Sequence, residues 1–539
     1  MKNKQHLTGA QAVIATLRAH NVDTIFGIPG VHTLPLYDVI RQEQGLRHVL
    51  TRHEQGTGLM ADGYARVSGR PGVACTITGP GVTNIATPVA SAYADSIPLL
   101  VISTSLPRAS QLRAWGELHE LKDQFGVMEA LAGWTRAVEH VAEIPGAIYD
   151  AFRAMRSGRP RGAYLQIPLD LLEASAEMEI PELASDEPER PSQETILAAA
   201  QLLREAQHPL IIAGAGVTAA NANTQLARLA ELLQSPVLLG AKSHDVLPSD
   251  HPLVISARGT LPGDLRALVE QSDVALIVGS KVGGQRTSST RLPLPTKLIQ
   301  IDIDPAEIGH NYPISIGIAS DARLALDALL NVLSEQPGDH PSPASELATI
   351  RDALRSRTHR NYGEGIELLD GVREGLPRDG ILVADMTMLG YASTQYFPVY
   401  EPRTYIHPSE LCTIGCGLPL ALGAKIAAPE RPVVALCGDG GFLLNIGELA
   451  TAVQEQIPVV TVIFNDSTYT AVKSDQYRRF GGRYIATDLR APDYVTIARG
   501  FGATSMQATN PEELRNAISQ TITNPGPTVI EVPLPPRQW

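Results

Sequence analysis

Two groups of polar residues interrupt apolar segments in the C-terminal third of the chain. Gly438, Asp439 and Gly440 directly follow the apolar run 433–437, and Asn465 and Asp466 directly follow the run 459–464. Glycines allow a sharp turn and a close approach of the backbone to a ligand, while the acidic side chains supply hard oxygen donors. Beside the free amides of a helix N-terminus, such donors are suited to a divalent cation and a diphosphate, with Mg²⁺ as the natural ion.

The segment between these two groups determines whether they can meet. Apolar residues at 446, 449, 450 and 453 follow the i, i+3, i+4, i+7 spacing, which predicts a helix with one buried stripe. The stretch 433–466 is therefore expected to form a strand, a helix and a second strand. Parallel strands end at the same edge of their sheet, so this unit would bring Asp439 and Asp466 together.

Further apolar runs predict the fold class. The runs 210–216, 274–280 and 298–304 are apolar nearly throughout, as expected of strands buried on both faces of a parallel sheet, and helical stretches alternate with them. Two segments rich in proline, serine and acidic residues, 180–195 and 334–346, have the composition of linkers. We expect an α/β protein with three consecutive domains, each a mainly parallel sheet flanked by helices. Their predicted bounds are 1–180, 190–335 and 350–539.

Composition excludes several classes of function. The net charge of -13 repels nucleic acids and anionic membranes, and no run of lysine and arginine is interleaved with aromatic residues. No apolar run approaches the roughly 20 residues that span a bilayer. The first residues, MKNKQHLTGAQAV, lack the apolar core of a signal peptide. We therefore expect a cytoplasmic protein that binds neither nucleic acid nor membrane.

The spacing of Gly-Asp-Gly and Asn-Asp resembles the diphosphate-binding signature of enzymes that depend on thiamine diphosphate. The resemblance implies that the side chains of Asp439 and Asp466 and the backbone carbonyl of Thr468 bind Mg²⁺. It also implies that the turns around them bind the cofactor, through Gly438, Asp439, Gly440, Gly441, Asn465 and Asp466. The family more often has asparagine at the position of Asp466, so an additional carboxylate is expected here.

The N-terminal region resembles the other half of such a cofactor site. Glu54 lies in "RHEQGTG", and "TGPGVTN" follows after the next predicted strand. In the family, a glutamate at this position interacts with the aminopyrimidine ring, and its carboxyl group supports removal of the thiazolium proton. The resemblance covers nearly the whole chain, in the order pyrimidine-binding, central and diphosphate-binding domain. It implies a cofactor held between two subunits, and hence a homodimer or homotetramer.

Four more residues are assigned by the same resemblance. Ile414 matches the bulky apolar residue that bends the cofactor into a V shape, and the carbonyl of Cys412 would accept the cofactor's amino group. His32 lies in a loop that faces the substrate in relatives, and a histidine there can donate a proton near pH 7. His119 stands where acetolactate synthases typically carry glutamine.

The resemblance to the acetolactate synthase and 2-oxo acid decarboxylase group leaves two reactions open. The first interpretation is decarboxylation of a 2-oxo acid followed by carboligation of the resulting enamine to an aldehyde or a second oxo acid. The alternative is a decarboxylase that releases an aldehyde. The motifs "FGIPGVHTLPLYD", "RHEQGTG" and "LHELKDQ" are most similar to decarboxylases of arginine-derived 5-guanidino-2-oxopentanoate. For such a cationic substrate, Glu410 and Asp475 are candidate acidic partners.

The central domain carries one weak nucleotide-binding pattern. Residues 214–219 fit G-x-G-x-x-A after a predicted strand, but Gly240, Ala241 and Lys242 follow the next strand, where dinucleotide sites have an acid. Segment 280–289 lacks the expected flavin contacts. FAD is therefore an alternative that the sequence does not favour, and an NAD-dependent dehydrogenase is not favoured either. A catalytically silent regulator would not need Glu54, Asp439 and Asp466 together.

Overall fold

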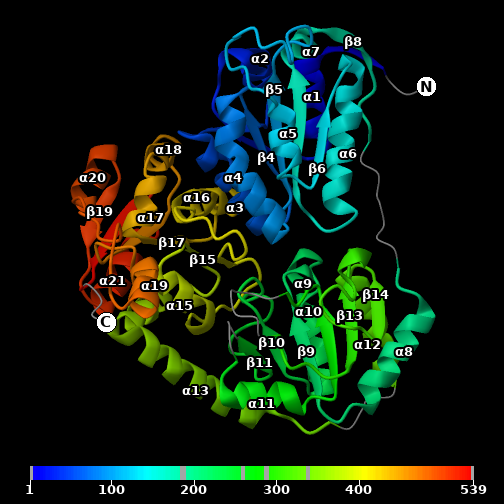
Figure 1. Ribbon diagram of the computed structural model, residues 1–539, viewed down its shortest axis with the longest axis vertical. Coiled ribbons are helices and arrows are strands. Elements are labelled where there is room, and N and C mark those ends of the chain that lie inside the picture. The colour runs from blue at the N-terminus through cyan, green and yellow to red at the C-terminus, as the bar shows by residue number, and fades with distance from the viewer. Residues whose placement is uncertain (1–3, 183–189, 257–260, 284–290, 336–339, 536–539) are drawn as a thin grey trace. The chain divides into compact units, whose positions relative to one another are not determined.

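The computed structural model describes residues 4–182, 190–256, 261–283, 291–335 and 340–535 (Figure 1). The chain divides into two compact units. One comprises residues 1–186, 410–508 and 519–539, and the other comprises residues 187–409 and 509–518. Three six-stranded sheets, each with helices beside it, confirm the predicted α/β fold. Segment 284–289, which belongs to the predicted flavin region, lies outside the described residues.

The N-terminal sheet belongs to the first unit, and all its neighbouring strands pair in parallel. Its order is β3 (Arg47–Leu50), β2 (Thr24–Gly27), β4 (Gly72–Thr76), β5 (Leu99–Ser105), β7 (Gly162–Pro168) and β6 (Trp134–Ala137). A short antiparallel pair joins β1 (Gln5–Thr8) to β8 (Ser175–Met178). The helices are α1 (Gly9–Ala19), α2 (Leu34–Gln42), α3 (Glu54–Ser68), α4 (Pro80–Asp95), α5 (Gln124–Glu129), α6 (Ile144–Arg156) and α7 (Leu169–Glu173).

The first unit also contains four strands of the C-terminal sheet. They are β17 (Val433–Gly438), β18 (Val460–Asn465), β20 (Thr528–Pro533) and β19 (Thr504–Gln507), in this spatial order and all parallel. The helices of this part are α16 (Gly417–Ala427), α17 (Asp439–Leu444), α18 (Glu448–Gln454), α19 (Thr470–Phe480) and α20 (Tyr494–Phe501).

The second unit contains the central sheet. Its order is β11 (Val254–Ser256), β10 (Val237–Leu239), β9 (Pro209–Ala213), β12 (Val274–Val278), β13 (Lys297–Asp302) and β14 (Ile316–Ala319), all parallel. The helices around it are α8 (Gln193–Glu205), α9 (Gly216–Ala219), α10 (Asn223–Leu233), α11 (Gly263–Gln271) and α12 (Ala322–Glu335). The unit continues with α13 (Ala344–Tyr362), α14 (Glu367–Gly375), β15 (Ile381–Ala384), α15 (Met388–Tyr396) and β16 (Tyr405–Ile406), and α21 (Pro511–Thr521) begins in its last segment.

The glycines of the central nucleotide-binding pattern are used within the fold. The amide of Gly214 donates to the carbonyl of Val278 at 2.8 Å, and the amide of Gly216 donates to that of Gly279 at 3.1 Å. A Cβ atom on Gly214 would overlap the Gly279 carbonyl oxygen. Close packing of two strand-end loops therefore accounts for these glycines, and their amides already have acceptors.

The predicted strand-helix-strand unit is confirmed in its strands but not in its helix. Strands β17 and β18 are parallel neighbours, as expected. The connection is two short helices, α17 and α18, separated by residues 445–447. The prediction of one apolar stripe is wrong, because this break changes which residues of the second helix face the core. Leu449 is buried as predicted, but Glu448 and Thr451 are buried beside it.

Helices α3 and α16 pack with their backbones almost in contact (Figure 1). A Cβ atom on Gly63 would overlap the carbonyl oxygen of Leu420, and one on Gly423 would overlap that of Met60. The contact partner moves backward along α16 as one moves forward along α3, so the two helices are antiparallel. Glycine at both contacts allows the two helix backbones to approach this closely.

A buried network of ion pairs lies at one end of this helix pair. Arg66 of α3 pairs with Asp62 and, at 2.9 Å, with Asp95, and both acidic side chains are almost completely buried. Asp95 also accepts a hydrogen bond from the backbone amide of Glu410 at 3.2 Å. The segment that leads into α16 is thereby tied to the N-terminal domain.

No helix among the described residues is both long enough and apolar enough to cross a membrane.

We predict that Gly423→Ala lowers the melting temperature, because the new methyl group must separate α16 from the Met60 backbone. Overpacking of this kind costs about 1–3 kcal/mol. Gly500→Ala is the matched control, since a Cβ atom on this helical glycine meets no atom within 4 Å. Differential scanning fluorimetry checks both variants. Equal melting temperatures for wild type and Gly423→Ala would contradict the packing argument.

Candidate active site

The two predicted metal-binding acids lie at the same edge of the C-terminal sheet. Asp439 is the first residue of α17, directly after β17, and Asp466 directly follows β18. The register pairs Gly438 with Phe464, so the two strands end side by side. Parallel pairing therefore brings together two carboxylates that are well separated in sequence, as the spacing predicts.

The environment of these acids suits a divalent cation. Asp439 is only 3% exposed, and its Oδ2 is a buried oxygen without a hydrogen-bond donor among the described residues. Burial, together with the charge of Asp466, raises the pKa of Asp439 to about 6. Burial also raises the pKa of Asp466. A buried acid beside a half-buried one is stabilised by a cation that both can bind.

Neutral groups complete this part of the site. Asp466 accepts hydrogen bonds from the amide of Thr468 at 3.3 Å and from the hydroxyl of Thr470. The described residues contain no group of three His, Cys, Asp or Glu side chains placed to hold a metal. The donor set is therefore two carboxylates plus neutral oxygens, which is the kind of set that Mg²⁺ accepts beside phosphate and water. The predicted Thr468 carbonyl would be one of them.

The glycine turn is closely packed. A Cβ atom on Gly440 would lie 2.9 Å from the Leu489 side chain and closer still to the ring of Tyr469, so only glycine fits. Tyr494 donates from its hydroxyl to the Asp439 carbonyl at 3.0 Å and fixes the same turn. The Asn465 side chain is directed to structural partners: its amide nitrogen donates to Glu531 at 2.8 Å, and its oxygen accepts from the Ser467 amide.

The segment with Cys412 and Ile414 lies beside α17. Gly415 has φ = +85°, and Asn445 donates from its side-chain amide to the Gly415 carbonyl at 2.7 Å. Cys412 is exposed and has φ = +55°, a backbone conformation that costs energy for a residue with a side chain. The structure thus places the predicted Cys412 and Ile414 close to the predicted metal turn, in a fixed loop.

Glu54 lies at the N-terminal half of the candidate site. It is the first residue of α3, and Asn84 donates from its side chain to Glu54 Oε2 at 2.9 Å. A Cβ atom on Gly81 would lie 3.4 Å from Glu54 Oε1, so the Gly79–Gly81 turn packs against the carboxylate. Gln124 accepts from the Gly79 amide at 2.8 Å and anchors that turn.

The two predicted histidines meet on the same side of this turn. Their rings lie edge to face with centroids 5.4 Å apart, although 86 residues separate His32 from His119 in sequence. A Cβ atom on Gly79 would overlap the His119 backbone. Burial and the proximity of His119 lower the pKa of His32, while the charge of Glu117 opposes that shift. His119 has φ = +64°, a strained conformation of the kind found at functional sites.

Within one chain, the two halves of the candidate cofactor site lie apart. Glu54 begins the 15-residue helix α3, and Ile414 lies just before the 11-residue helix α16. Because the helices are antiparallel, these residues lie toward opposite ends of the pair, roughly 20 Å apart at 1.5 Å per residue. The structure therefore brings Glu54, His32 and His119 together, and separately Asp439, Asp466, Cys412 and Ile414.

Several polar residues of the site were missed by the sequence analysis. Asn84 belongs to the quoted motif "TGPGVTN" and could have been singled out as a partner of Glu54. The sequence gives no local pattern for three others, because each contributes through a contact with a residue distant in sequence. They are Gln124, Tyr494 and Glu448.

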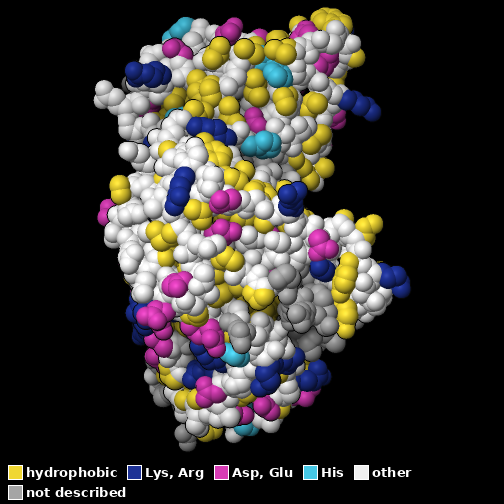
Figure 2. Space-filling view, turned by 90° about the vertical axis from the view of Figure 1, so that its left-hand side faces the viewer, with side chains coloured by type: hydrophobic (Ala, Val, Ile, Leu, Met, Phe, Trp, Pro, Cys, Tyr) yellow, Lys and Arg dark blue, Asp and Glu magenta, His cyan; other side chains and the backbone are white. Residues whose placement is uncertain are grey.

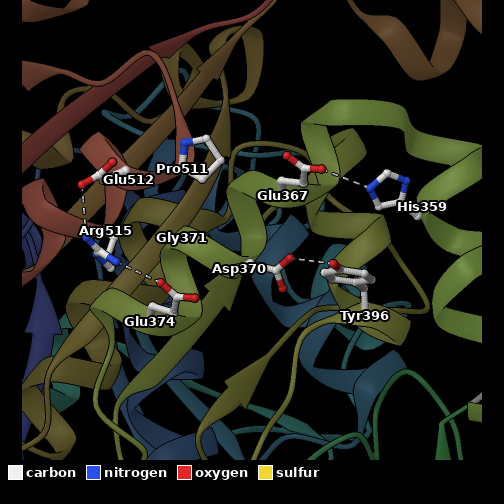
Figure 3. Close-up of a pocket in the computed structure, with 9 residues that line it drawn as sticks. All are labelled: His359, Glu367, Asp370, Gly371, Glu374, Tyr396, Pro511, Glu512 and Arg515. Carbon is white, nitrogen blue, oxygen red and sulfur yellow. Dashed lines mark hydrogen bonds and ion pairs between the residues drawn. The ribbon is translucent and has the colours of Figure 1, made fainter. Parts of the chain in front are cut away.

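A surface hollow of about 580 Å³ lies elsewhere in the second unit and contains none of the predicted residues (Figure 3). Its acidic side chains already have partners: Glu367 pairs with His359, Asp370 accepts from Tyr396, and Glu374 pairs with Arg515. We assign no chemistry to it.

Comparison with known proteins assigns the three parts of the chain to one family. Three family models match the chain: the N-terminal TPP binding domain of thiamine pyrophosphate enzymes at 7–127, the central domain at 196–329 and the C-terminal TPP binding domain at 385–532. A probable 2-ketoarginine decarboxylase of Pseudomonas aeruginosa is 38% identical over 99% of this chain and 95% of its own length.

Acetolactate synthases are also similar over nearly the whole chain. The probable large subunit from Methanocaldococcus jannaschii is 32% identical over 99% of this chain and 93% of its own length. The isozyme 1 large subunit of Escherichia coli is 30% identical over 98% of this chain and 94% of its own length.

We predict that Asp439→Asn has opposite effects with and without Mg²⁺. Without the ion, the variant should melt at a higher temperature than wild type, because repulsion with Asp466 is relieved. With Mg²⁺ and the diphosphate ligand, it should lose the stabilisation that wild type gains, about 2.7 kcal/mol at 100 times the Kd. Scanning fluorimetry with and without Mg²⁺ measures both. Asp488→Asn, which removes an exposed partner of Lys473, is the control. An Asp439→Asn variant that responds to Mg²⁺ like wild type would rule out this site.

Proposed function

Because the chain belongs to the thiamine pyrophosphate enzyme family, we propose that it uses thiamine diphosphate and Mg²⁺ to decarboxylate a 2-oxo acid and releases the product as an aldehyde. Held by Glu54 and by the turns at Asp439 and Asp466, thiamine diphosphate would supply the electron sink that decarboxylation of a 2-oxo acid requires. The protein must then deliver one proton to the substrate carbon. The residues that control this proton determine the product.

The His32 and His119 pair is the observation that carries the proposal. The two imidazoles are neighbours, half-buried and packed on the turn that also contacts Glu54. Because burial and the proximity of His119 lower the pKa of His32, its ring releases a proton more readily than a free imidazole, as a general acid beside the substrate requires. General acid catalysis of this kind typically contributes 10²- to 10⁴-fold in rate, or about 3–6 kcal/mol.

A second copy of the chain completes the site in this proposal. Glu54 and the Cys412–Ile414 segment lie toward opposite ends of the α3 and α16 pair, so one chain does not bring them to one cofactor. Apolar side chains are exposed beside both halves: Val31, Leu34 and Leu118 near the histidines, and Leu443, Leu444 and Ile485 in the C-terminal part. Hydrophobic side chains are frequent on the N-terminal domain at the top of Figure 2. Burial of such surfaces favours a homodimer or homotetramer.

A cationic oxo acid is the proposed substrate class. Glu410 is half-buried, and the hydrogen bond from its backbone amide to Asp95 fixes it four residues before Ile414. An acid in this position can accept a guanidinium group, and the relative named a probable 2-ketoarginine decarboxylase acts on such a molecule by its name. Asp475, the other candidate, is exposed, and water screens the attraction of an exposed acid for a cation. The half-buried Glu410 is therefore the better partner.

Carboligation is the second candidate function. The acetolactate synthase relatives support it, since they cover the same length of chain. In that case the decarboxylated carbon attacks an aldehyde or a second oxo acid before a proton reaches it. The two functions thus differ in whether the proton or the second carbonyl arrives first.

We predict that His119→Gln slows aldehyde release by about 10²-fold, because the variant keeps a hydrogen-bonding side chain and loses the transferable proton. Carbon dioxide release and aldehyde formation should be measured with 5-guanidino-2-oxopentanoate and with pyruvate, each with and without an added aldehyde. We expect the ratio of hydroxy ketone to free aldehyde to rise in the variant. His140→Gln, an exposed histidine at the start of a short helical turn in the same domain, is the control.

Wild-type protein that yields an acetohydroxy acid or hydroxy ketone as its main product would replace the decarboxylase proposal with the carboligase. An unchanged rate and product ratio in His119→Gln would remove the histidine pair from the mechanism.

We predict that Glu410→Gln raises KM for 5-guanidino-2-oxopentanoate by about 10-fold and leaves KM for a neutral oxo acid of similar length unchanged. Hydrogen bonds to charged groups contribute about 1.5–3 kcal/mol, and the variant removes the charge but keeps the shape. Asp475→Gln is the control and should affect neither substrate. Equal increases for both substrates would show that Glu410 does not select the cation.

A further inference from the structure

Glu448 is a buried carboxylate that the predicted metal and cofactor residues leave unexplained. It is the first residue of α18, nine positions after Asp439, and only 1% of its surface is exposed. Burial raises its pKa, while hydrogen bonds from Thr451, Arg52 and His53 oppose that shift. A buried acid is retained only where it has donors, so its contacts indicate what it does.

The donors to Glu448 come mainly from the turn that precedes Glu54. The backbone amides of Arg52 and His53 both donate to its carboxylate, at 3.1 Å and 3.0 Å, and the Thr451 hydroxyl donates at 2.7 Å. Its Oε1 accepts from both amides, and its Oε2 accepts from Arg52 at 3.2 Å and from Thr451. One carboxylate thus bridges a helix of the C-terminal part to two consecutive amides of the N-terminal part.

The chain leaves space for this bridge. Gly56 lies in the first turn of α3, and a Cβ atom there would overlap the Glu448 carboxylate. His53 is the residue that caps α3, and its ring nitrogen accepts from the Gln55 amide at 3.1 Å. The turn before Glu54 is therefore held on one side by its own cap and on the other side by Glu448.

We propose that Glu448 is a positioning residue, which holds the Arg52–His53 turn and thereby directs the Glu54 carboxylate toward the aminopyrimidine ring of the cofactor. Asn84 holds the Glu54 side chain itself, and Glu448 holds the backbone that carries it. The inference rests on the family assignment and on the predicted role of Glu54. It does not depend on whether the product is an aldehyde or a carboligation product.

A carboxylate is better suited than an amide to this task. It offers two acceptor oxygens to two backbone amides and a hydroxyl, whereas glutamine offers one oxygen and turns its NH₂ group toward donors. Glu448→Gln should therefore keep the packing but release part of the turn. A displacement of about 1 Å at a catalytic group can cost on the order of 10²-fold in rate.

The test compares Glu448→Gln with Glu54→Gln and with a matched control, Glu455→Gln. Glu455 belongs to the same region, where it contacts Leu50 and Arg47 of the neighbouring strand but not the turn at 52–53. Three quantities should be measured in each full-length variant: hydrogen exchange of peptides covering 51–56 without cofactor, Kd for thiamine diphosphate with Mg²⁺, and exchange of the thiazolium C2 proton of the bound cofactor in D₂O.

In Glu448→Gln we expect faster amide exchange at 51–56 and C2 proton exchange slowed by between about 10- and 100-fold, with Kd for the cofactor within about threefold of wild type. Glu54→Gln should slow C2 exchange at least as much but leave amide exchange at 51–56 unchanged. Glu455→Gln should resemble wild type in all three. Gly56→Ala, whose new methyl group displaces the Glu448 carboxylate, should reproduce the Glu448→Gln result.

Either of two results for Glu448→Gln would overturn the proposal. One is wild-type C2 exchange in a folded Glu448→Gln protein. The other is slower C2 exchange that is matched by an equal loss of cofactor affinity and melting temperature, which would indicate a purely structural residue. Unchanged C2 exchange in Glu54→Gln would overturn the role of Glu54 and this proposal with it. Product analysis tests the decarboxylase proposal separately, since none of these readouts depends on the product.

Discussion

The antiparallel packing of α3 on α16 is the constraint on which the rest of the site depends. The two helices approach so closely that glycines must face the carbonyl oxygens of Leu420 and Met60. Helix α3 begins with Glu54, and α16 follows the loop with Cys412 and Ile414. A shift of one helix along the other would therefore move both groups of functional residues. This explains why the sequence places its smallest residue at positions where helices normally favour larger ones.

Polar contacts at the two ends of this helix pair fix the direction of the backbone segments that lead into the helices. At one end, the buried Arg66 and Asp95 hold the amide of Glu410 and so the segment before α16. At the other end, Glu448 accepts from the amides that precede Glu54. Buried charges are costly unless they are fully paired, and here each is used to fix a backbone segment. The buried Asp95 and Glu448 thus each fix a backbone segment that leads into one helix of the pair.

The elements that sequence predicted correctly are those specified locally. Strands β17 and β18 and the polar turns after them follow from apolar runs and glycine, and the parallel sheet then places Asp439 beside Asp466. The helix between them was mispredicted, because residues 445–447 break it and change which side is buried. Periodicity assumes that buried positions are apolar, so an acid such as Glu448 is invisible to it.

The contact between His32 and His119 shows the other limit of sequence reasoning. Each histidine could be placed near the substrate from its motif, but their contact depends on how the loops after β2 and β5 meet over the Gly79 turn. That contact changes the chemistry, because burial and the proximity of His119 lower the pKa of His32. In the proposed function, a proton that reaches the substrate carbon before a second carbonyl binds leads to aldehyde release, so the geometry of this pair, rather than the cofactor common to the family, would distinguish a decarboxylase from a carboligase.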